Sequence, residues 1–244
     1  FYPADLPASR FLSYYAERFP AVEINNTFYR MPVPDQLTAW RAEVPPEFRF
    51  ILKAPRQITH IKRLRDVEQP VARLLEVSAS LEEARGPLLF QLPPNMKKDV
   101  DRLRGLLELL PSDVRAAVEF RNDTWYDDEV YATLREHGAS FCITHTEEGD
   151  SPFAATAPWG YLRLRGVRYE DEELKTWIER IRATDWTDVF VFFKHEDEAT
   201  GPRLAARQPL GDARRTLLRA EHRRIHLQVI DPRGVHRVLP HLRA

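Results

Sequence analysis

Short apolar segments that end in polar residues alternate with helical segments along most of the chain. In the clearest of them, Ala117, Glu119 and Arg121 share one face of a strand, and Val118 and Phe120 share the other. The apolar face has to pack against another element. The acid and the base stand together at the carboxyl end of the strand, which is where α/β proteins bind ligands.

The order of the predicted elements is strand, helix, strand, helix, and this order favours a parallel sheet with helices outside it. We expect strands at 21–28, 49–54, 88–92, 115–120, 140–144, 161–165 and 189–194. The helices are expected at 7–19, 34–43, 67–84, 99–110, 128–137, 172–183 and 201–207.

The polar strand ends distinguish between the two folds that alternate in this way. An open doubly wound sheet has strands that are apolar on both faces, whereas each predicted strand here has a polar face near its end. We therefore predict a TIM-type (β/α)8 barrel. An eightfold barrel needs one strand more than the chain shows, and we expect that first strand to be missing before residue 1.

Length and composition place the chain among ordinary globular proteins. It has 244 residues, of which 43% are hydrophobic and 30% charged, and its net charge of −1 gives no general reason to bind nucleic acid or membranes. No apolar run reaches the length of a membrane span. Cys142, the single cysteine, lies in an apolar run and suits a reducing compartment, so we expect a cytoplasmic protein.

The last part of the chain differs from the rest because its many arginines face few acids. We divide the chain into a barrel domain at 1–207 and a basic C-terminal extension at 208–244. A solvated helix face with a loose end explains the arginines, and a basic arm for nucleic acid is the alternative. The apolar run 225–230 could also form one more strand and replace the missing one.

Five ordered motifs add a family resemblance. They are EINNTFY at 23–29, KAPRQITH at 53–60, QLPP at 91–94, EFR at 119–121 with Trp125, and RLRG at 163–166. Together they resemble the domain of unknown function 72 family of YecE-like proteins over roughly residues 1–207. The resemblance implies a TIM-type barrel. It implies no catalytic roles, because the family has no established activity.

The chain departs from the family pattern at three places. Asn122 and Arg165 stand where the family usually has histidine, and Lys194 and His195 replace a usual pair of asparagines. The family also opens on a first strand resembling Gly-Thr-Ser-Gly-Trp, which this chain lacks. That difference agrees with the strand expected before residue 1.

Charged and amide side chains are expected to point inward at the carboxyl end of the barrel. They are Glu23, Asn25, Lys53, Gln91, Glu119, Arg121, Arg163 and Arg165, with Lys194 as a further candidate. Buried charges must be paired or must meet a ligand, and here the cations outnumber the acids. Arginine suits phosphate and carboxylate groups, so we predict a small anionic ligand. A closed ion-pair network that only fills the barrel is the alternative.

Our leading hypothesis is an enzyme of hydrolase or phosphoryl-transfer type that acts on a phosphorylated small molecule or nucleotide. Glu119 and Glu23 are the catalytic candidates, as base or metal ligand. Side chains expected to bind the substrate are Lys53, Arg121, Arg163 and Arg165, which hold the anion, Asn25 and Gln91, which orient it, and Tyr29, His60 and Trp125, which line or cover it.

No residue is assigned to a metal, although a divalent metal stays open as a cofactor. His60, His145 and His195 could stand at strand ends, but they lack the close spacing of metal ligands. No glycine-rich phosphate loop and no Gly-x-Ser-x-Gly motif occurs. The rival hypothesis is a non-catalytic barrel that binds nucleic acid through its aromatic loops and basic tail.

Overall fold

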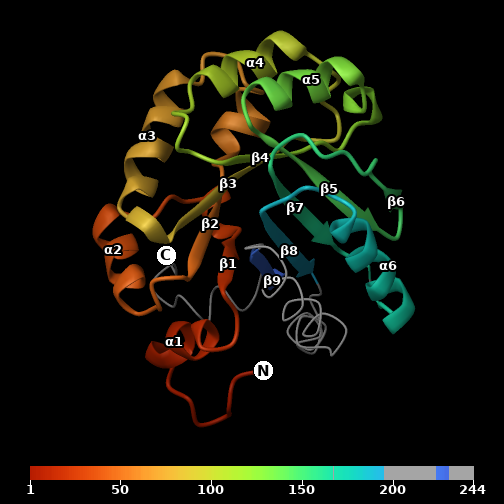
Figure 1. The fold of residues 1–244 in the computed structure, drawn as a ribbon. Helices are drawn as coiled ribbons and strands as arrows, with labels where there is room; N and C mark the ends of the chain where they lie inside the picture. Colours follow the sequence, from red (N-terminus) through yellow and green to blue (C-terminus); the bar gives the residue numbers. More distant parts are fainter. Residues whose placement is uncertain (167, 195–223, 231–244) are drawn as a thin grey trace.

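The computed structural model describes residues 1–166, 168–194 and 224–230 (Figure 1). The strands are β1 Ala21–Ile24, β2 Arg49–Lys53, β3 Arg85–Gln91, β4 Ala116–Glu119, β5 Ser140–Thr146, β6 Gly149–Asp150, β7 Trp159–Leu164, β8 Asp188–Lys194 and β9 Arg224–Ile230. The α-helices are α1 Phe11–Ala16, α2 Pro34–Ala42, α3 Glu68–Ala79, α4 Val100–Glu108, α5 Asp128–Glu136 and α6 Asp171–Arg182.

The sheet is a parallel barrel that is nearly closed. Its strands follow the order β1-β2-β3-β4-β5-β7-β8-β9, and each neighbouring pair on this path is parallel. β6 is a short antiparallel addition to β5. The helices lie around the outside of the sheet (Figure 1). This is the TIM-type fold that the alternation of strands and helices predicts.

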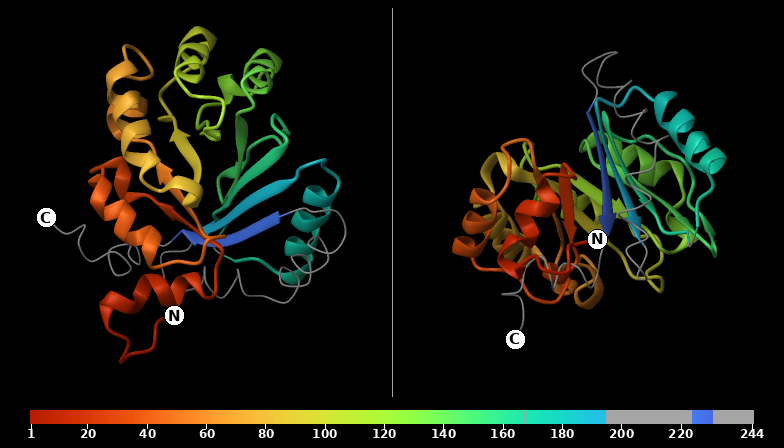
Figure 2. Two further views of the ribbon diagram at one scale, coloured as in Figure 1. Left: turned by 60° about the vertical axis from the view of Figure 1, so that its left-hand side comes forward. Right: turned by 90° about the horizontal axis from the view of Figure 1, so that it is seen from below.

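The strand β9 lies between β8 and β1. It pairs with β8 in parallel over its whole length, from Arg224 opposite Asp188 to Ile230 opposite Lys194. β1 is its neighbour on the other side (Figure 2). The apolar run 225–230 therefore belongs to the sheet. The domain boundary that we placed at residue 207 leaves this run outside the barrel, whereas the alternative, one more strand in place of the missing one, agrees with β9. The helix expected at 201–207 and the rest of 208–244 lie outside the described residues.

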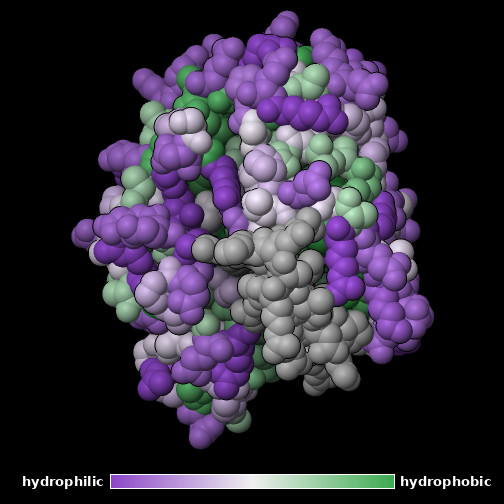
Figure 3. Space-filling view, viewed as in Figure 1, coloured by the Kyte–Doolittle hydropathy of each residue, from purple (hydrophilic) through white to green (hydrophobic). Residues whose placement is uncertain are grey.

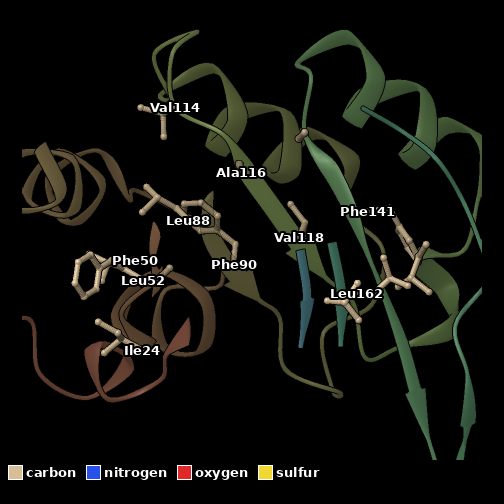
Figure 4. Close-up of a cluster of buried hydrophobic side chains, with 14 of the residues drawn as sticks. Ile24, Phe50, Leu52, Leu88, Phe90, Val114, Ala116, Val118, Phe141 and Leu162 are labelled. Atoms are coloured by element: carbon tan, nitrogen blue, oxygen red, sulfur yellow. The ribbon is translucent and has the colours of Figure 1, made fainter. Parts of the chain in front are cut away.

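Alternation along the strands produces two buried apolar layers. One face of each strand points outward to the helices and forms the larger layer, part of which Figure 4 shows with Ile24, Phe90, Val118 and Leu162 among its members. The opposite face forms a smaller layer inside the barrel, made of Ala21, Ile51, Leu89, Ala117, Cys142, Trp159, Tyr161, Phe190 and Phe192. A side chain two residues beyond an inner member also points into the barrel.

Two loops at the carboxyl end of the barrel begin with tight turns. β1 stops at Ile24 rather than at residue 28, because the Thr27 hydroxyl lies 2.8 Å from the Ile24 carbonyl and 2.7 Å from that of Lys53. After β2 the chain forms a π-helical turn, Gln57–Ile61. It then passes through left-handed backbone at Arg63, Leu64 and Asp66, a conformation that costs energy in residues other than glycine.

The outside of the barrel matches the amphipathic pattern of its helices. Hydrophilic residues cover most of the face drawn in Figure 3, while the opposite sides of α3, α4, α5 and α6 contribute to the outer apolar layer. Among the described residues, no helix has both the length and the apolar character that crossing a membrane requires.

Because β9 lies between β8 and β1, we expect the stability of the barrel to depend on it. A chain that ends at residue 207 lacks β9, so the edges of β8 and β1 are left without a neighbour. We expect this chain to unfold at a clearly lower temperature or to aggregate. A chain that ends at residue 230 keeps β9 and should melt close to the full chain. Equal melting of the two truncated chains, measured by circular dichroism, would contradict the placement of β9.

Candidate functional site

Charged and polar side chains fill the carboxyl end of the barrel above the inner apolar layer. Each lies two residues beyond an inner apolar member of the same strand: Glu23 follows Ala21, Lys53 follows Ile51, Gln91 follows Leu89, Glu119 follows Ala117, and Arg163 follows Tyr161. They point inward because side chains alternate along a strand. The strands β1, β2, β3, β4 and β7 thus bring together the residues that the sequence predicts.

Arg163 lies at the centre of this cluster, between two carboxylates. Its Nη2 donates to Glu23 Oε1 at 2.8 Å, and its Nη1 donates to Glu119 Oε2. All three side chains are essentially buried, with Glu23 and Glu119 at 0% and Arg163 at 3% exposure. Charges in such surroundings interact strongly but are costly to desolvate, so each of them depends on the others.

The remaining acceptor positions of Glu23 are filled from two sides. Asn25 donates to Oε1 at 2.9 Å, and the Tyr161 hydroxyl donates to Oε2 at 2.6 Å. Burial and the nearby Glu23 raise the pKa of Tyr161 well above its usual value, so it stays a donor. Our sequence analysis did not assign Tyr161 to the site. Its position two residues before Arg163 on the same face of β7 was the signal that could have found it.

The surrounding arginines favour the ionised form of Glu119, which acts as an acceptor. Burial alone would raise its pKa, but the attraction of Arg163, Arg121 and Arg165 outweighs burial and holds the pKa well below its usual range. Gln91 Nε2 donates to Oε1 at 2.8 Å, and Arg121 Nε donates to the same oxygen at 3.0 Å. Both oxygens therefore have donors, and the carboxylate holds two arginines and an amide in fixed orientations.

Lys53 stands beside this network and has no ion-pair partner among the described residues. Its Nζ donates to Gln91 Oε1 at 2.8 Å and lies 4.3 Å from the centroid of the Phe28 ring. Burial, followed by the charge of Arg163, lowers its pKa to about 8, although Glu119 partly opposes this. Lys53 is thus the one cation of the cluster that can lose its proton near neutral pH.

Arg121 and Arg165 carry the positive charge on the solvent side of the cluster. Their side chains are 34% and 19% exposed. Arg121 uses only Nε on Glu119, and Arg165 Nη2 lies 3.9 Å from Glu119 Oε1. Arg165 Nε is buried without a hydrogen-bond partner among the described residues. Burial lowers the pKa of Arg165, with nearby Arg163 and Arg121 acting in the same direction against Glu119.

His60 and Tyr29 lie in the loops that follow the first two strands. The His60 ring packs edge-on against Phe28 at 4.8 Å, and its Nδ1 lies 2.9 Å from the Thr59 hydroxyl. Burial and the charges of Lys53 and Arg121 lower the pKa of His60, which favours the neutral ring. Tyr29 also packs against Phe28 but is 71% exposed.

Trp125 does not cover the mouth of the barrel, and our prediction for it was wrong. The indole is fully buried in the outer apolar layer and stacks on Phe120, with ring centroids 4.8 Å apart. Its Nε1 donates to the Met96 carbonyl at 2.7 Å. The reason is alternation: Phe120 follows the inward Glu119 and therefore faces the helices. The turn Asp123–Trp125 then folds the indole onto that outer face.

The described residues contain no group of three or more histidine, cysteine or carboxylate side chains that could hold a metal ion. His145 is engaged elsewhere, since its Nδ1 lies 2.6 Å from the Tyr169 hydroxyl and its Nε2 lies 3.7 Å from Asp150 Oδ1. His195 and the side chain of Lys194 lie outside the part of the chain that the structure describes. Within the described part of the chain, the cluster is an arrangement of organic cations and carboxylates.

The central position of Arg163 yields a stability prediction. Arg163→Met leaves two buried carboxylates without their shared cation, and we expect it to lower the free energy of unfolding by about 3–5 kcal/mol. Arg121→Met is the control, because Glu119 keeps Arg163 and Gln91 as donors. It should cost at most about 1.5 kcal/mol. Urea denaturation measures both values, and similar losses in the two variants would contradict the central role of Arg163.

Comparisons with known proteins agree with this architecture. The chain is similar to the UPF0759 protein YecE of Escherichia coli K12, with 31% identity over 116 residues. That match covers 47% of this chain and 43% of YecE, so it spans less than half of that relative. The UPF0759 protein YunF of Bacillus subtilis strain 168 is 24% identical over 213 residues, covering 81% of this chain and 74% of YunF.

Two solved structures share the fold. A DUF72 family protein from Enterococcus faecalis V583 superposes with a TM-score of 0.70 at 20% identity, covering 85% of this chain and 93% of that one. A DUF72 family protein from Thermotoga maritima MSB8 has a TM-score of 0.67 at 29% identity, covering 79% and 85%. The family model described as "Protein of unknown function DUF72" matches residues 1–223. The chain therefore belongs to the DUF72 family.

Proposed function

We propose that the carboxyl end of the barrel binds a small anion, and that the protein is an enzyme of hydrolase or phosphoryl-transfer type acting on a phosphorylated small molecule or nucleotide. The observation that carries the proposal is the charge of the cluster. Among the described residues, Lys53, Arg121, Arg163 and Arg165 surround two carboxylates, Glu23 and Glu119. Arg163 already pairs with both of them.

The excess charge is directed toward solvent. Arg121 and Arg165 each keep guanidinium nitrogens that donate to no described residue, and both side chains are partly exposed. Guanidinium groups held in this way form paired hydrogen bonds to phosphate or carboxylate oxygens. A bound anion would also relieve the mutual repulsion of these cations, which is a reason for the apo site to be strained.

The arginines at the two ends of the barrel differ in how they pair with carboxylates. At the opposite end a surface depression is also rich in arginine, lined by Arg49, Arg85, Arg115, Asp113 and Asp188 among others. There Arg85 pairs with Asp113 and Arg115 pairs with Asp188, each at 2.7 Å. Arg85 and Arg115 thus each have a surface carboxylate of their own, whereas Arg121 and Arg165 at the mouth share the buried Glu119 as their only carboxylate partner among the described residues. We therefore assign the ligand to the carboxyl end.

We assign Glu119 and Glu23 a positioning role in place of the acid–base role considered first. Every carboxylate oxygen of the pair already accepts a hydrogen bond, and the lowered pKa makes Glu119 a weak base. Their contribution would be to hold Arg121, Arg163 and Gln91 where charge develops during phosphoryl transfer. His60, with its neutral ring, is then the better candidate to accept a proton from water.

The alternative is a non-catalytic barrel that binds nucleic acid. The exposed Tyr29 ring beside the basic loop 56–66 favours it, because bases stack on exposed aromatic rings while cations contact the phosphates. The two proposals differ in the smallest ligand that the protein should bind. The anion site requires a single phosphate group, whereas the nucleic-acid surface requires a strand.

Thermal melting with and without inorganic phosphate or a nucleoside monophosphate tests the anion site. We expect the wild type to be stabilised by about 2.7 kcal/mol at a phosphate concentration 100-fold above the dissociation constant. Arg121→Met should bind roughly 10- to 150-fold more weakly, since a charged hydrogen bond contributes about 1.5–3 kcal/mol. The matched control is Arg73→Met, which removes an exposed arginine paired with Glu76 on α3.

The control variant should respond to phosphate like the wild type. Release of phosphate from a panel of phosphomonoesters tests the enzyme assignment, and Arg121→Met should lower kcat/KM by a similar factor. A wild type that is indifferent to phosphate and to the monophosphate contradicts the anion site. Stabilisation by a single-stranded oligonucleotide alone, with a steep dependence on salt, favours the nucleic-acid alternative.

A further inference from the structure

We propose that Lys53 is a nucleophile that forms an imine with a carbonyl group of the ligand, so that the site takes anionic aldehydes or ketones. The proposal rests on the anion site described above and adds a covalent step to it. It stands on three geometric features: the surroundings of the Lys53 amine, the Phe28 ring that contacts both Lys53 and His60, and the arginines around them.

The amine of Lys53 is placed as a reacting group rather than as an ion-pair partner. Within the described residues, no carboxylate lies within 4.0 Å of Nζ, and Gln91 Oε1 accepts one of its hydrogens at 2.8 Å. The charged groups that act on it are Arg163 and Arg121, which disfavour the ammonium form, and Glu119 and Glu23, which favour it. Burial is the largest influence and favours the neutral amine.

The other groups of the cluster cannot take this role. A guanidinium does not lose its proton in proteins, which excludes Arg121, Arg163 and Arg165 as nucleophiles. Cys142 lies in the inner apolar layer, where burial raises the pKa of its thiol well above the usual value. A desolvated lysine beside other cations is a known arrangement for an activated amine.

We assign the proton transfers of such a reaction to His60, which packs on the same Phe28 ring as Lys53. Lys53 Nζ lies 4.3 Å from the ring centroid, and the centroids of the His60 and Phe28 rings are 4.8 Å apart. Nδ1 of His60 is engaged with Thr59, so Nε2 is the nitrogen left for exchange. The neutral ring can accept the proton that the attacking amine loses and return it to the departing oxygen.

Imine formation begins when the lone pair of Lys53 Nζ attacks the carbonyl carbon and forms a carbon–nitrogen bond. The carbonyl π electrons move to oxygen, which takes up a proton from water, and the nitrogen gives one proton to His60. The carbinolamine then loses its hydroxyl group as water after a second protonation, and the protonated imine remains. Arg121 and Arg165 would hold the anionic group of the same molecule, so the carbonyl is presented to the amine rather than to solvent.

Reductive labelling with pyridoxal 5′-phosphate, an anionic aldehyde, tests the proposal. The protein is incubated with a limiting amount of the reagent, the imine is reduced with borohydride, and the modified lysines are identified by peptide mass mapping. We expect Lys53 to react at least about tenfold faster than Lys98 or Lys175. Carboxylate partners raise the pKa of both comparison lysines, and even a lysine with an ordinary pKa near 10.4 holds roughly a hundredfold less free amine at neutral pH than Lys53 does. Inorganic phosphate should protect Lys53 from the reagent.

Two variants and a second reagent complete the test. Lys53→Arg keeps the charge but has no amine that can react, so the rapidly labelled site should disappear while the melting temperature stays near that of the wild type. Lys175→Arg is the control, because Lys175 is exposed on α6 and pairs with Glu172. In this variant Lys53 should still be labelled rapidly. Pyridoxal, which lacks the phosphate group, should label Lys53 more slowly than pyridoxal 5′-phosphate does.

The outcomes separate this proposal from the anion site. If phosphate stabilises the protein but Lys53 reacts no faster than Lys98 with either reagent, the imine proposal is overturned and the anion site stands. If Lys53 reacts rapidly with both reagents alike and phosphate gives no protection, the nucleophile stands and the anion site is overturned. Rapid labelling of Lys53 that phosphate suppresses supports both.

Discussion

The buried bridge of Arg163 between Glu23 and Glu119 is the interaction on which the rest of the site depends. It joins β1, β4 and β7, which lie far apart in sequence, across the inside of the barrel. Three buried charges are stable there only while they pair with one another. Asn25, Tyr161, Gln91 and Arg121 each donate to one of the two carboxylates, so their orientations follow from the bridge.

The bridge also explains why the solvent side of the cluster is positively charged. Because Arg163 pairs with both carboxylates, Arg121 and Arg165 share Glu119, which already has other donors. Lys53 donates to the Gln91 amide and pairs with no carboxylate among the described residues. The same arrangement that stabilises the interior therefore leaves cations at the mouth. A closed network and an anion site are thus not exclusive: the inner part of the cluster is a closed network, and its outer part is the proposed site.

The sequence predicts the barrel and the inward residues well because both follow from the period of two along a strand. Glu23, Lys53, Gln91, Glu119 and Arg163 all point into the barrel at the strand ends, as their spacing from apolar neighbours indicates. The same period of two places Tyr161 on the inner face of β7 with Arg163, but it does not tell which carboxylate the Tyr161 hydroxyl reaches across the barrel.

Prediction was poorer where the backbone leaves the strands. Trp125 and Tyr29 both stand shortly after a strand, yet one is fully buried against the helices and the other is exposed. The tight turns Asp123–Trp125 and Asn26–Phe28 decide this, and periodicity carries no information about them. The pairing of β9 with β8 is likewise a long-range contact that a short apolar run cannot specify.

A crystal soaked in selenate, a tetrahedral oxyanion with an anomalous signal, tests the anion site most directly. We expect an anomalous peak at the carboxyl end of the barrel, within hydrogen-bond distance of the guanidinium groups of Arg121 and Arg165. A peak that lies only in the arginine-lined depression at the opposite end, or no peak in the barrel at all, would contradict it.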